Sequence, residues 1–136
     1  MLGPKEGQTA YEVFRIYDDE SGALRIQQIR LDGLCQAPPD GSPSHEAWDE
    51  LGRLYYRAWH DQDKDHRLDS FSSVAINPEN GVHITEVYKI EGKPRPPESG
   101  PHIIRRDKET GEVTETLYAP VSKAPNVQQK NQGPQP

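Results

Sequence analysis

Alternation of apolar and polar residues recurs along the chain and predicts β-strands. The clearest case covers residues 82–90, where one face carries four apolar side chains: Val82, Ile84, Tyr88 and Ile90. Such period-two alternation is typical of a half-buried strand. Glu86 interrupts this face, which indicates a sheet edge or a pair with an arginine rather than a general base. The same pattern places further strands at residues 11–17, 23–31, 70–76, 102–106 and 112–119.

Three turns of one kind join these strands in pairs. Each begins with Asp or Asn and ends with Gly four residues later, at Asp18–Gly22, Asn77–Gly81 and Asp107–Gly111. The first side chain can accept hydrogen bonds from backbone N–H groups two residues on, and the glycine can take a positive φ, so three β-hairpins are predicted. Because the flanking strands do not repeat in the same way, we interpret the likeness as shared turn chemistry rather than a duplicated domain. A change of phase in the second strand predicts a β-bulge at Gln27 and Gln28.

Between these strands, apolar residues three and four apart predict one amphipathic helix over residues 43–60. Its apolar stripe consists of Ala47, Trp48, Leu51, Leu54, Tyr55, Ala58 and Trp59. Ser42 or Ser44 can cap its start, and the two tryptophans are expected to anchor it to the sheet. The expected fold class is α+β, a single domain ordered ββ-α-ββ-ββ, with this helix packed on a largely antiparallel sheet of about six strands.

Length and composition limit the size of the folded part. The 136 residues suit one domain, expected over residues 9–119. Only 32% of the residues are hydrophobic and the mean hydropathy is -0.96, so the core must be small. Residues 120–136 are rich in Pro and Gln and are expected to be a disordered tail, because they hold too few large apolar groups to offset the entropy of ordering.

Charge and cysteine usage exclude several function classes. The formal net charge is -6, which argues against nucleic-acid partners and against an anionic membrane surface. The single Cys35 cannot form an internal disulfide, and no apolar stretch is long enough to span a membrane, so a cytoplasmic setting is expected. Cys35 is assigned no role.

The sequence DQDKDHRLD, residues 61–69, comes closest to recognisable chemistry. It resembles a calcium-binding EF-hand loop, because Asp61, Asp63, Asp65 and Asp69 stand at ligand positions 1, 3, 5 and 9 of such a loop. His66 replaces the glycine of that loop and Ser72 its bidentate glutamate, so a Ca2+ site here would be weak, with a Kd on the order of 10⁻⁴ to 10⁻³ M. A transition-metal site on His60, Asp61, Asp63 and His66 is a lesser alternative.

The favoured interpretation of these four aspartates is a negative patch at the end of the helix that binds a protein with a basic surface. The expected function is that of a small acidic, non-enzymatic protein-binding module of the inhibitor, immunity or accessory type, which uses this helix-end loop or an open sheet edge. Weak binding of Ca2+ or another hard cation is the alternative, and a metal-dependent hydrolase is third. Catalytic residues are not assigned, because the chain has no glycine-flanked serine, phosphate-binding glycine loop or HExxH pair. Partner identity and oligomeric state stay open.

Overall fold

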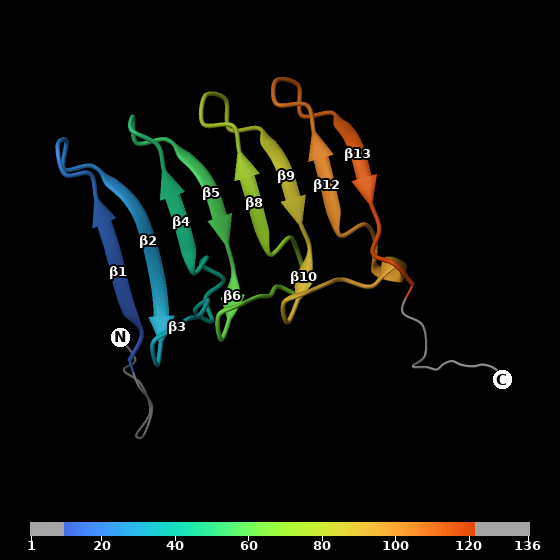
Figure 1. The fold of residues 1–136 in the computed structure, drawn as a ribbon, viewed down its shortest axis with the longest axis horizontal. Helices are drawn as coiled ribbons and strands as arrows, with labels where there is room; N and C mark the ends of the chain where they lie inside the picture. Colours follow the sequence, from blue (N-terminus) through green and yellow to red (C-terminus); the bar gives the residue numbers. More distant parts are fainter. Residues whose placement is uncertain (1–9, 122–136) are drawn as a thin grey trace.

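The computed structural model describes residues 10–121, which form one broad antiparallel β-sheet (Figure 1). Its strands follow the order β1-β2-β4-β5-β8-β9-β12-β13, with the short β3 paired to the last two residues of β2. The bounds are β1 (Glu12–Tyr17), β2 (Leu24–Leu31), β3 (Leu34–Cys35), β4 (His45–Trp48), β5 (Leu54–Ala58), β8 (Ser73–Ile76), β9 (His83–Val87), β12 (Ile103–Arg106) and β13 (Val113–Leu117). Two short hairpins lie beside this sheet: β6 (His60–Asp61) with β7 (Lys64–Asp65), and β10 (Lys89–Ile90) with β11 (Lys93–Pro94).

The expected α+β fold with a helix over residues 43–60 is wrong. That segment forms the hairpin β4–β5, and the helical structure within residues 10–121 is one short 3-10 turn, η1 (Pro97–Ser99). A turn at Asp49 and Gly52 reverses the chain: the Asp49 carboxylate accepts the N–H groups of Leu51 and Arg53, both at 2.9 Å, and Gly52 has φ 80°. Leu51, placed on the apolar stripe of the expected helix, is instead exposed at the turn.

The four long hairpins share one geometry. Their turns carry Gly22, Gly52, Gly81 and Gly111, at intervals of 30, 29 and 30 residues, with φ between 75° and 81°. The three hairpin turns expected from the sequence are confirmed, since Asp18, Asn77 and Asp107 each accept a backbone N–H two residues on. The expected bulge at Gln27 and Gln28 is wrong, because the pairing of β1 with β2 is regular there and shifts near the turn, at Ile16 and Tyr17.

Short turns at the other end of the strands repeat with the same spacing. They lie between β2 and β3, between β6 and β7, and between β10 and β11 (Figure 1). In each, two successive residues have positive φ: Asp32 and Gly33, Gln62 and Asp63, Glu91 and Gly92. Two successive positive φ values are the signature of the tight type I′ hairpin turn. A long hairpin followed by a short one is therefore the repeating unit.

Backbone hydrogen bonds repeat wherever one unit meets the next. Three N–H groups donate across these junctions: Ile29 to the Ser44 carbonyl at 2.8 Å, Trp59 to Ser72 at 2.7 Å and Tyr88 to His102 at 2.8 Å. The interpretation of the turns as shared chemistry without repetition is thus wrong. The repeat lies in backbone geometry and turn residues, while the strand side chains differ: Phe14, His45, Ser73 and Ile103 occupy one position in four successive units.

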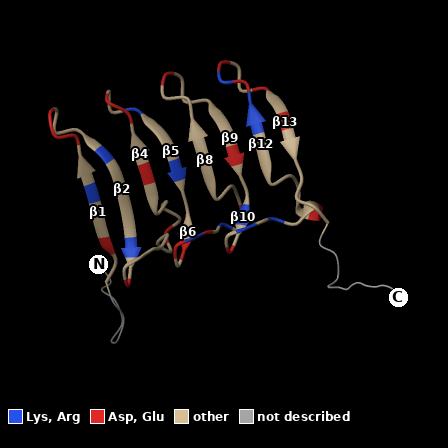
Figure 2. Ribbon diagram, in the orientation of Figure 1, with Lys and Arg blue, Asp and Glu red and all other residues tan. Residues whose placement is uncertain are grey.

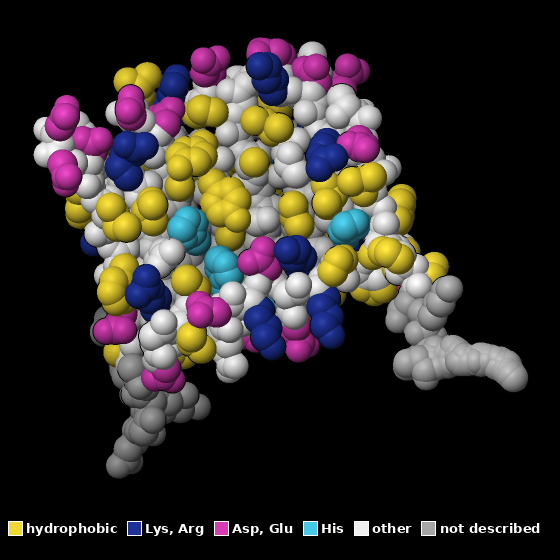
Figure 3. Space-filling model, viewed as in Figure 1, with side chains coloured by type: hydrophobic (Ala, Val, Ile, Leu, Met, Phe, Trp, Pro, Cys, Tyr) yellow, Lys and Arg dark blue, Asp and Glu magenta, His cyan; other side chains and the backbone are white. Residues whose placement is uncertain are grey.

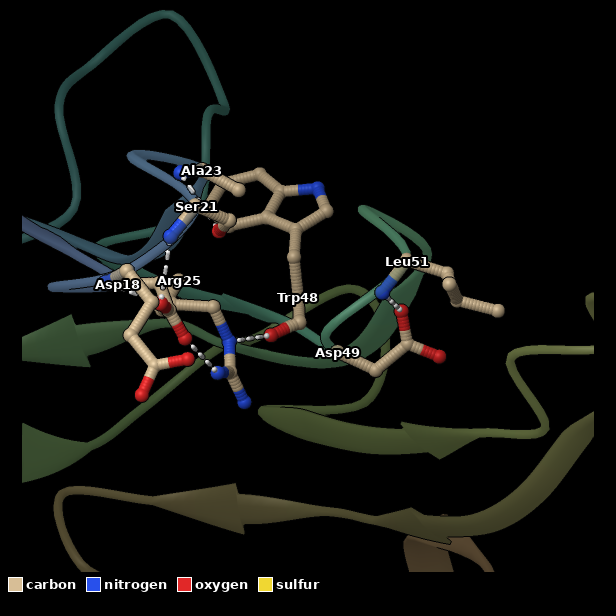
Figure 4. Close-up of polar contacts among 8 residues, drawn as sticks. Asp18, Ser21, Ala23, Arg25, Trp48, Asp49 and Leu51 are labelled. Carbon is tan, nitrogen blue, oxygen red and sulfur yellow. Dashed lines mark hydrogen bonds and ion pairs between the residues drawn. The ribbon is translucent and has the colours of Figure 1, made fainter.

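Side chains near the long turns also join neighbouring units (Figure 4). Arg25 on β2 donates Nε to the Trp48 carbonyl on β4 at 2.9 Å and Nη1 to Asp18 at 3.3 Å. Asp18 and Asp49 each cap their own turn, so Arg25 ties the first turn to the strand that leads into the second.

The core is as small as the composition implies. Five apolar residues within residues 10–121 are buried: Ala47, Ala58, Trp59, Val74 and Ile76. One layer of strands leaves both faces of the sheet largely open. Each hairpin therefore depends on the neighbouring strands to bury its apolar side chains. Residues 1–9 and the predicted disordered tail at residues 122–136 lie outside the described residues. No helix in the described part of the chain is long and apolar enough to cross a membrane.

Candidate functional site

Three of the four aspartates of residues 61–69 lie in the short hairpin β6–β7 rather than at the end of a helix. Asp61 ends β6, Asp63 occupies the turn and Asp65 ends β7, whereas Asp69 follows in a loop. Figure 2 shows acidic segments at the turns between the long strands and again beside β6. The expected helix-end patch is therefore corrected to a short-hairpin turn.

Asp63 joins its own turn to the preceding unit. Its N–H donates to the Cys35 carbonyl at 2.9 Å, and its carboxylate accepts the Cys35 N–H at 2.7 Å. The equivalent positions in the other short turns are Gly33 and Gly92, so Asp63 keeps the positive φ of 70° and adds a side-chain contact. Gln36 adds two more bonds, from its Nε2 to Asp61 at 3.0 Å and from the Gln62 N–H to its Oε1 at 3.0 Å.

Asp65 belongs to a chain of hydrogen bonds with a histidine and a serine. Its carboxylate lies 3.2 Å from His60 Nε2, and His60 Nδ1 lies 2.7 Å from Ser44 Oγ. The hydrogen bond from His60 holds the pKa of Asp65 below its ordinary value, against the opposing effect of burial. A serine, a histidine and a carboxylate in this order suit nucleophilic catalysis. Ser44 is fully buried, however, so its oxygen is closed to a substrate and the chain of bonds holds the strands together.

These contacts use most of the groups that the metal alternatives require. His66, named for a transition-metal site, accepts the Glu91 N–H on Nδ1 at 2.9 Å, and Asp69 lies 3.5 Å from Arg67. Within residues 10–121, no three His, Cys, Asp or Glu side chains are placed to hold a metal ion together. The geometry thus gives no support to a Ca2+ or transition-metal site.

Replacing Asp63 tests its structural role. Asp63→Ala is expected to lower the free energy of unfolding by about 1–2 kcal/mol, because alanine is strained at positive φ and cannot accept the Cys35 N–H. Asp63→Gly loses only the hydrogen bond and should lose about half as much, while Asp63→Asn keeps both features and should stay near wild type. Urea unfolding measures this order, and equal losses in all three variants would contradict the role.

The neighbouring His45 is held in its neutral form. Arg30 donates to Gln28 Oε1 from Nε at 3.2 Å and from Nη2 at 2.7 Å, which fixes the orientation of the Gln28 amide. The Gln28 NH₂ group therefore faces His45 Nδ1 at 3.0 Å, so this ring nitrogen must accept and cannot carry a proton. Burial, with a smaller contribution from His60, lowers the pKa of His45 below its ordinary value.

This arrangement predicts acid sensitivity. Because the native pKa of His45 is lowered, the unfolded chain binds a proton at this residue at a higher pH than the native chain does. The free energy of unfolding therefore falls as the pH falls from about 6.5 towards the lowered native pKa. One proton gives at most about 1.4 kcal/mol per pH unit. Urea unfolding at pH 7.0 and 5.5 should show a smaller loss in His45→Gln than in wild type, and an identical loss would rule out this role.

Glu86, the carboxylate that interrupts the apolar face of residues 82–90, is paired with an arginine as expected. It is buried, and its oxygens lie 3.3 Å from Arg106 Nη2 and 2.8 Å from His83 Nδ1. Arg106 Nη1 also donates to the Gly111 carbonyl at 3.1 Å. Both oxygens of Glu86 are thus engaged by neighbouring side chains, as in a structural ion pair rather than a general base.

The two outer strands carry most of the exposed large hydrophobic residues of the described chain. All six residues of β1 are exposed, as are four of the five residues of β13. Of twelve exposed large hydrophobic residues in the described chain, eight lie on or beside these strands: Tyr11, Val13, Phe14, Ile16, Tyr17, Val113, Tyr118 and Val121. Hydrophobic and histidine side chains also gather over the middle of the sheet on the face that Figure 3 shows. Contiguous exposed apolar residues mark interaction surfaces.

The backbone at these edges is also open to a partner strand. Along an antiparallel strand, successive residues direct their N–H and C=O groups to alternate sides. Ile29 donates to Ser44 on the β4 side, so Gln28 bonds to Phe14 and the groups of Val13 and Arg15 point outward. Leu117 accepts the His102 N–H on the β12 side, so the groups of Thr116 and Tyr118 point outward.

The comparisons supply no relative for this chain: no protein-family model, no curated protein and no solved structure matches it. The sequence pattern predicts an open sheet edge in general terms but does not identify the edge residues. The signal that could have found them is residues 12–17, EVFRIY, where apolar side chains occur on both faces of the strand.

Proposed function

We propose that this chain is a non-enzymatic protein-binding module that accepts a partner strand at the open edges of its sheet. In such β-augmentation, main-chain hydrogen bonds supply affinity and alternate side chains supply specificity. The observation that carries the proposal is β1, a six-residue edge strand, exposed throughout, with four large apolar side chains and outward-pointing backbone groups. Natural proteins blunt such edges unless they are used. We also propose a reducing, cytoplasmic setting for the protein, which the free thiol of Cys35 fits.

The edge supports this function better than the acidic turn does. Asp61, Asp63 and Asp65 have partners within the chain, at Gln36, Cys35 and His60, so a basic partner would have to compete with these bonds. By contrast, no described residue beyond β2 pairs with β1.

Affinity capture from the native cell extract tests the proposal with a matched pair of variants. Arg15→Pro removes one outward N–H from β1 and is compatible with an edge strand, whereas Arg15→Ala removes the same side chain and keeps that N–H. Capture of a partner should fall at least tenfold with Arg15→Pro and stay near wild type with Arg15→Ala. Slower hydrogen exchange of the Val13 and Arg15 amides in the complex would locate the partner on β1. Equal capture by both variants and unchanged exchange would refute edge binding.

A further inference from the structure

We infer that the strand accepted by this edge is the edge of a second copy of the chain, so that β13 of one copy pairs with β1 of the next and the sheet continues from molecule to molecule. The inference rests on the proposed function, because both use the same edges, and it specifies the partner.

Each of the three internal junctions contains the same backbone hydrogen bond. The outer strand β13 carries the donor of a fourth such bond, and the outer strand β1 carries its acceptor. Gln28, Ala58, Val87 and Leu117 hold equivalent positions in the four units. The donors Ile29, Trp59 and Tyr88 each come directly after this position, so the equivalent donor in the fourth unit is Tyr118. The acceptors Ser44, Ser72 and His102 each precede the position that Phe14 occupies in β1, so the corresponding acceptor is Val13. Within residues 10–121, the Tyr118 N–H donates to no backbone carbonyl, and the alternation along β1 points the Val13 carbonyl away from β2.

Strand direction allows the same junction between copies. The strands alternate in direction through four complete hairpins, so β1 at one end of the sheet and β13 at the other run oppositely (Figure 1). A second copy placed beside the first in the same orientation thus sets its β1 antiparallel to β13, as β4 is to β2 and β12 is to β9. This contact joins two different surfaces, so each copy keeps one free edge after pairing and the contact can recur, in a closed ring or an open filament.

The register of the internal junctions places compatible side chains opposite each other. Val87 pairs with Ile103 and Gln28 with His45, and the equivalent pair between copies is Leu117 with Phe14. Thr116 then lies opposite Arg15, and Tyr118 lies opposite Val13. Tyr118 and Val13 are 58% and 50% exposed within one chain, so this pairing buries apolar surface on one face while Leu117 and Phe14 meet on the other. No like charges face each other in this register.

Variants that block one edge each provide the test. Arg15→Pro removes an outward N–H from β1, and Thr116→Pro removes one from β13. Sedimentation of the full wild-type chain should show a mass that rises with concentration beyond a dimer. Each proline variant alone should stay at the 15.4 kDa of one chain. An equimolar mixture should form a complex of twice that mass and stop there, because it contains one intact β13 and one intact β1.

The matched controls are Arg15→Ala and Thr116→Ala, which keep the backbone N–H groups and should associate like wild type. Circular dichroism and melting temperature confirm that all four variants fold. A wild-type chain that stays monomeric up to about 1 mM overturns the inference, as does a proline variant that still associates alone by pairing like edges or sheet faces. The proposed function survives such a result if Arg15→Pro, but not Arg15→Ala, abolishes capture of a foreign protein.

A crosslink tests the register. In a Cys35→Ser background, Phe14→Cys and Leu117→Cys should form a disulfide between copies upon oxidation, because opposed residues without mutual hydrogen bonds have Cα atoms about 4.5 Å apart. Ile16→Cys with Leu117→Cys is the control, since Ile16 lies two residues further along the same face of β1. Equal crosslinking of both pairs, or none in the first, contradicts the register.

Discussion

Trp59→Ala is expected to lower the free energy of unfolding by about 3–5 kcal/mol, the usual cost of truncating a buried tryptophan. Trp59 follows β5 and is 8% exposed. Its ring lies under the Arg67 guanidinium, 3.9 Å from the ring centroid, and edge-on to Phe71, with ring centroids 5.8 Å apart. Its Nε1 donates to the Gly41 carbonyl at 2.9 Å. Because the core holds four other buried apolar residues, little can repack into the cavity.

Tyr55→Ala is the matched control, since Tyr55 is an aromatic residue on β5 that is 39% exposed. Its loss should stay within about 1 kcal/mol. Urea unfolding followed by circular dichroism measures both variants. If Trp59→Ala lowers the free energy of unfolding no more than Tyr55→Ala does, the sheet does not depend on the packing of Trp59 against Arg67 and Phe71. A total stability of roughly 5–15 kcal/mol for ordinary domains makes the expected loss a large fraction of the whole.

The hairpins could be predicted from the sequence because their determinants are local. An Asp or Asn that caps its own turn, followed four residues later by a glycine at positive φ, specifies the reversal almost independently of the rest of the chain. The turn at Asp49 and Gly52 is one residue shorter and was missed. Apolar residues on both sides of it happen to recur at helical spacing. Gly52, which costs about 1 kcal/mol inside a helix and lies 30 residues after Gly22, is the signal that separates the two interpretations.

The edge strands of the candidate site were harder to predict, because a strand is an edge only if the strand order leaves one of its sides unpaired. The aspartates of residues 61–69 stand out in the sequence by their number. The partner of Asp63, however, is the backbone of Cys35, 28 positions away. The spacing of residues along the chain cannot reveal such a contact. The edges require the strand order, which follows only after residues 43–60 are recognised as a hairpin. Once four equivalent hairpins stand side by side, β1 and β13 are the strands with one unpaired side.

Arg106→Met is expected to lower the free energy of unfolding by about 2–4 kcal/mol, because it leaves the buried Glu86 carboxylate without its cationic partner on β12. The lower part of this range is favoured, since the Arg106 side chain is 30% exposed and water can reach part of the pair. His83 remains 2.8 Å from Glu86, but its side chain is 38% exposed and it engages the other oxygen.

A double-mutant cycle separates this pair from the packing of the arginine stem. Glu86→Gln in the Arg106→Met background removes the unpaired charge and should recover at least 1 kcal/mol, because the neutral amide is less costly to bury than a carboxylate. Glu86→Gln alone should cost less than Arg106→Met alone, since Arg106 keeps its bond to the Gly111 carbonyl. If the two substitutions instead add within about 0.5 kcal/mol, Glu86 and Arg106 act independently and the stabilisation of β9 against β12 comes from the strand hydrogen bonds alone.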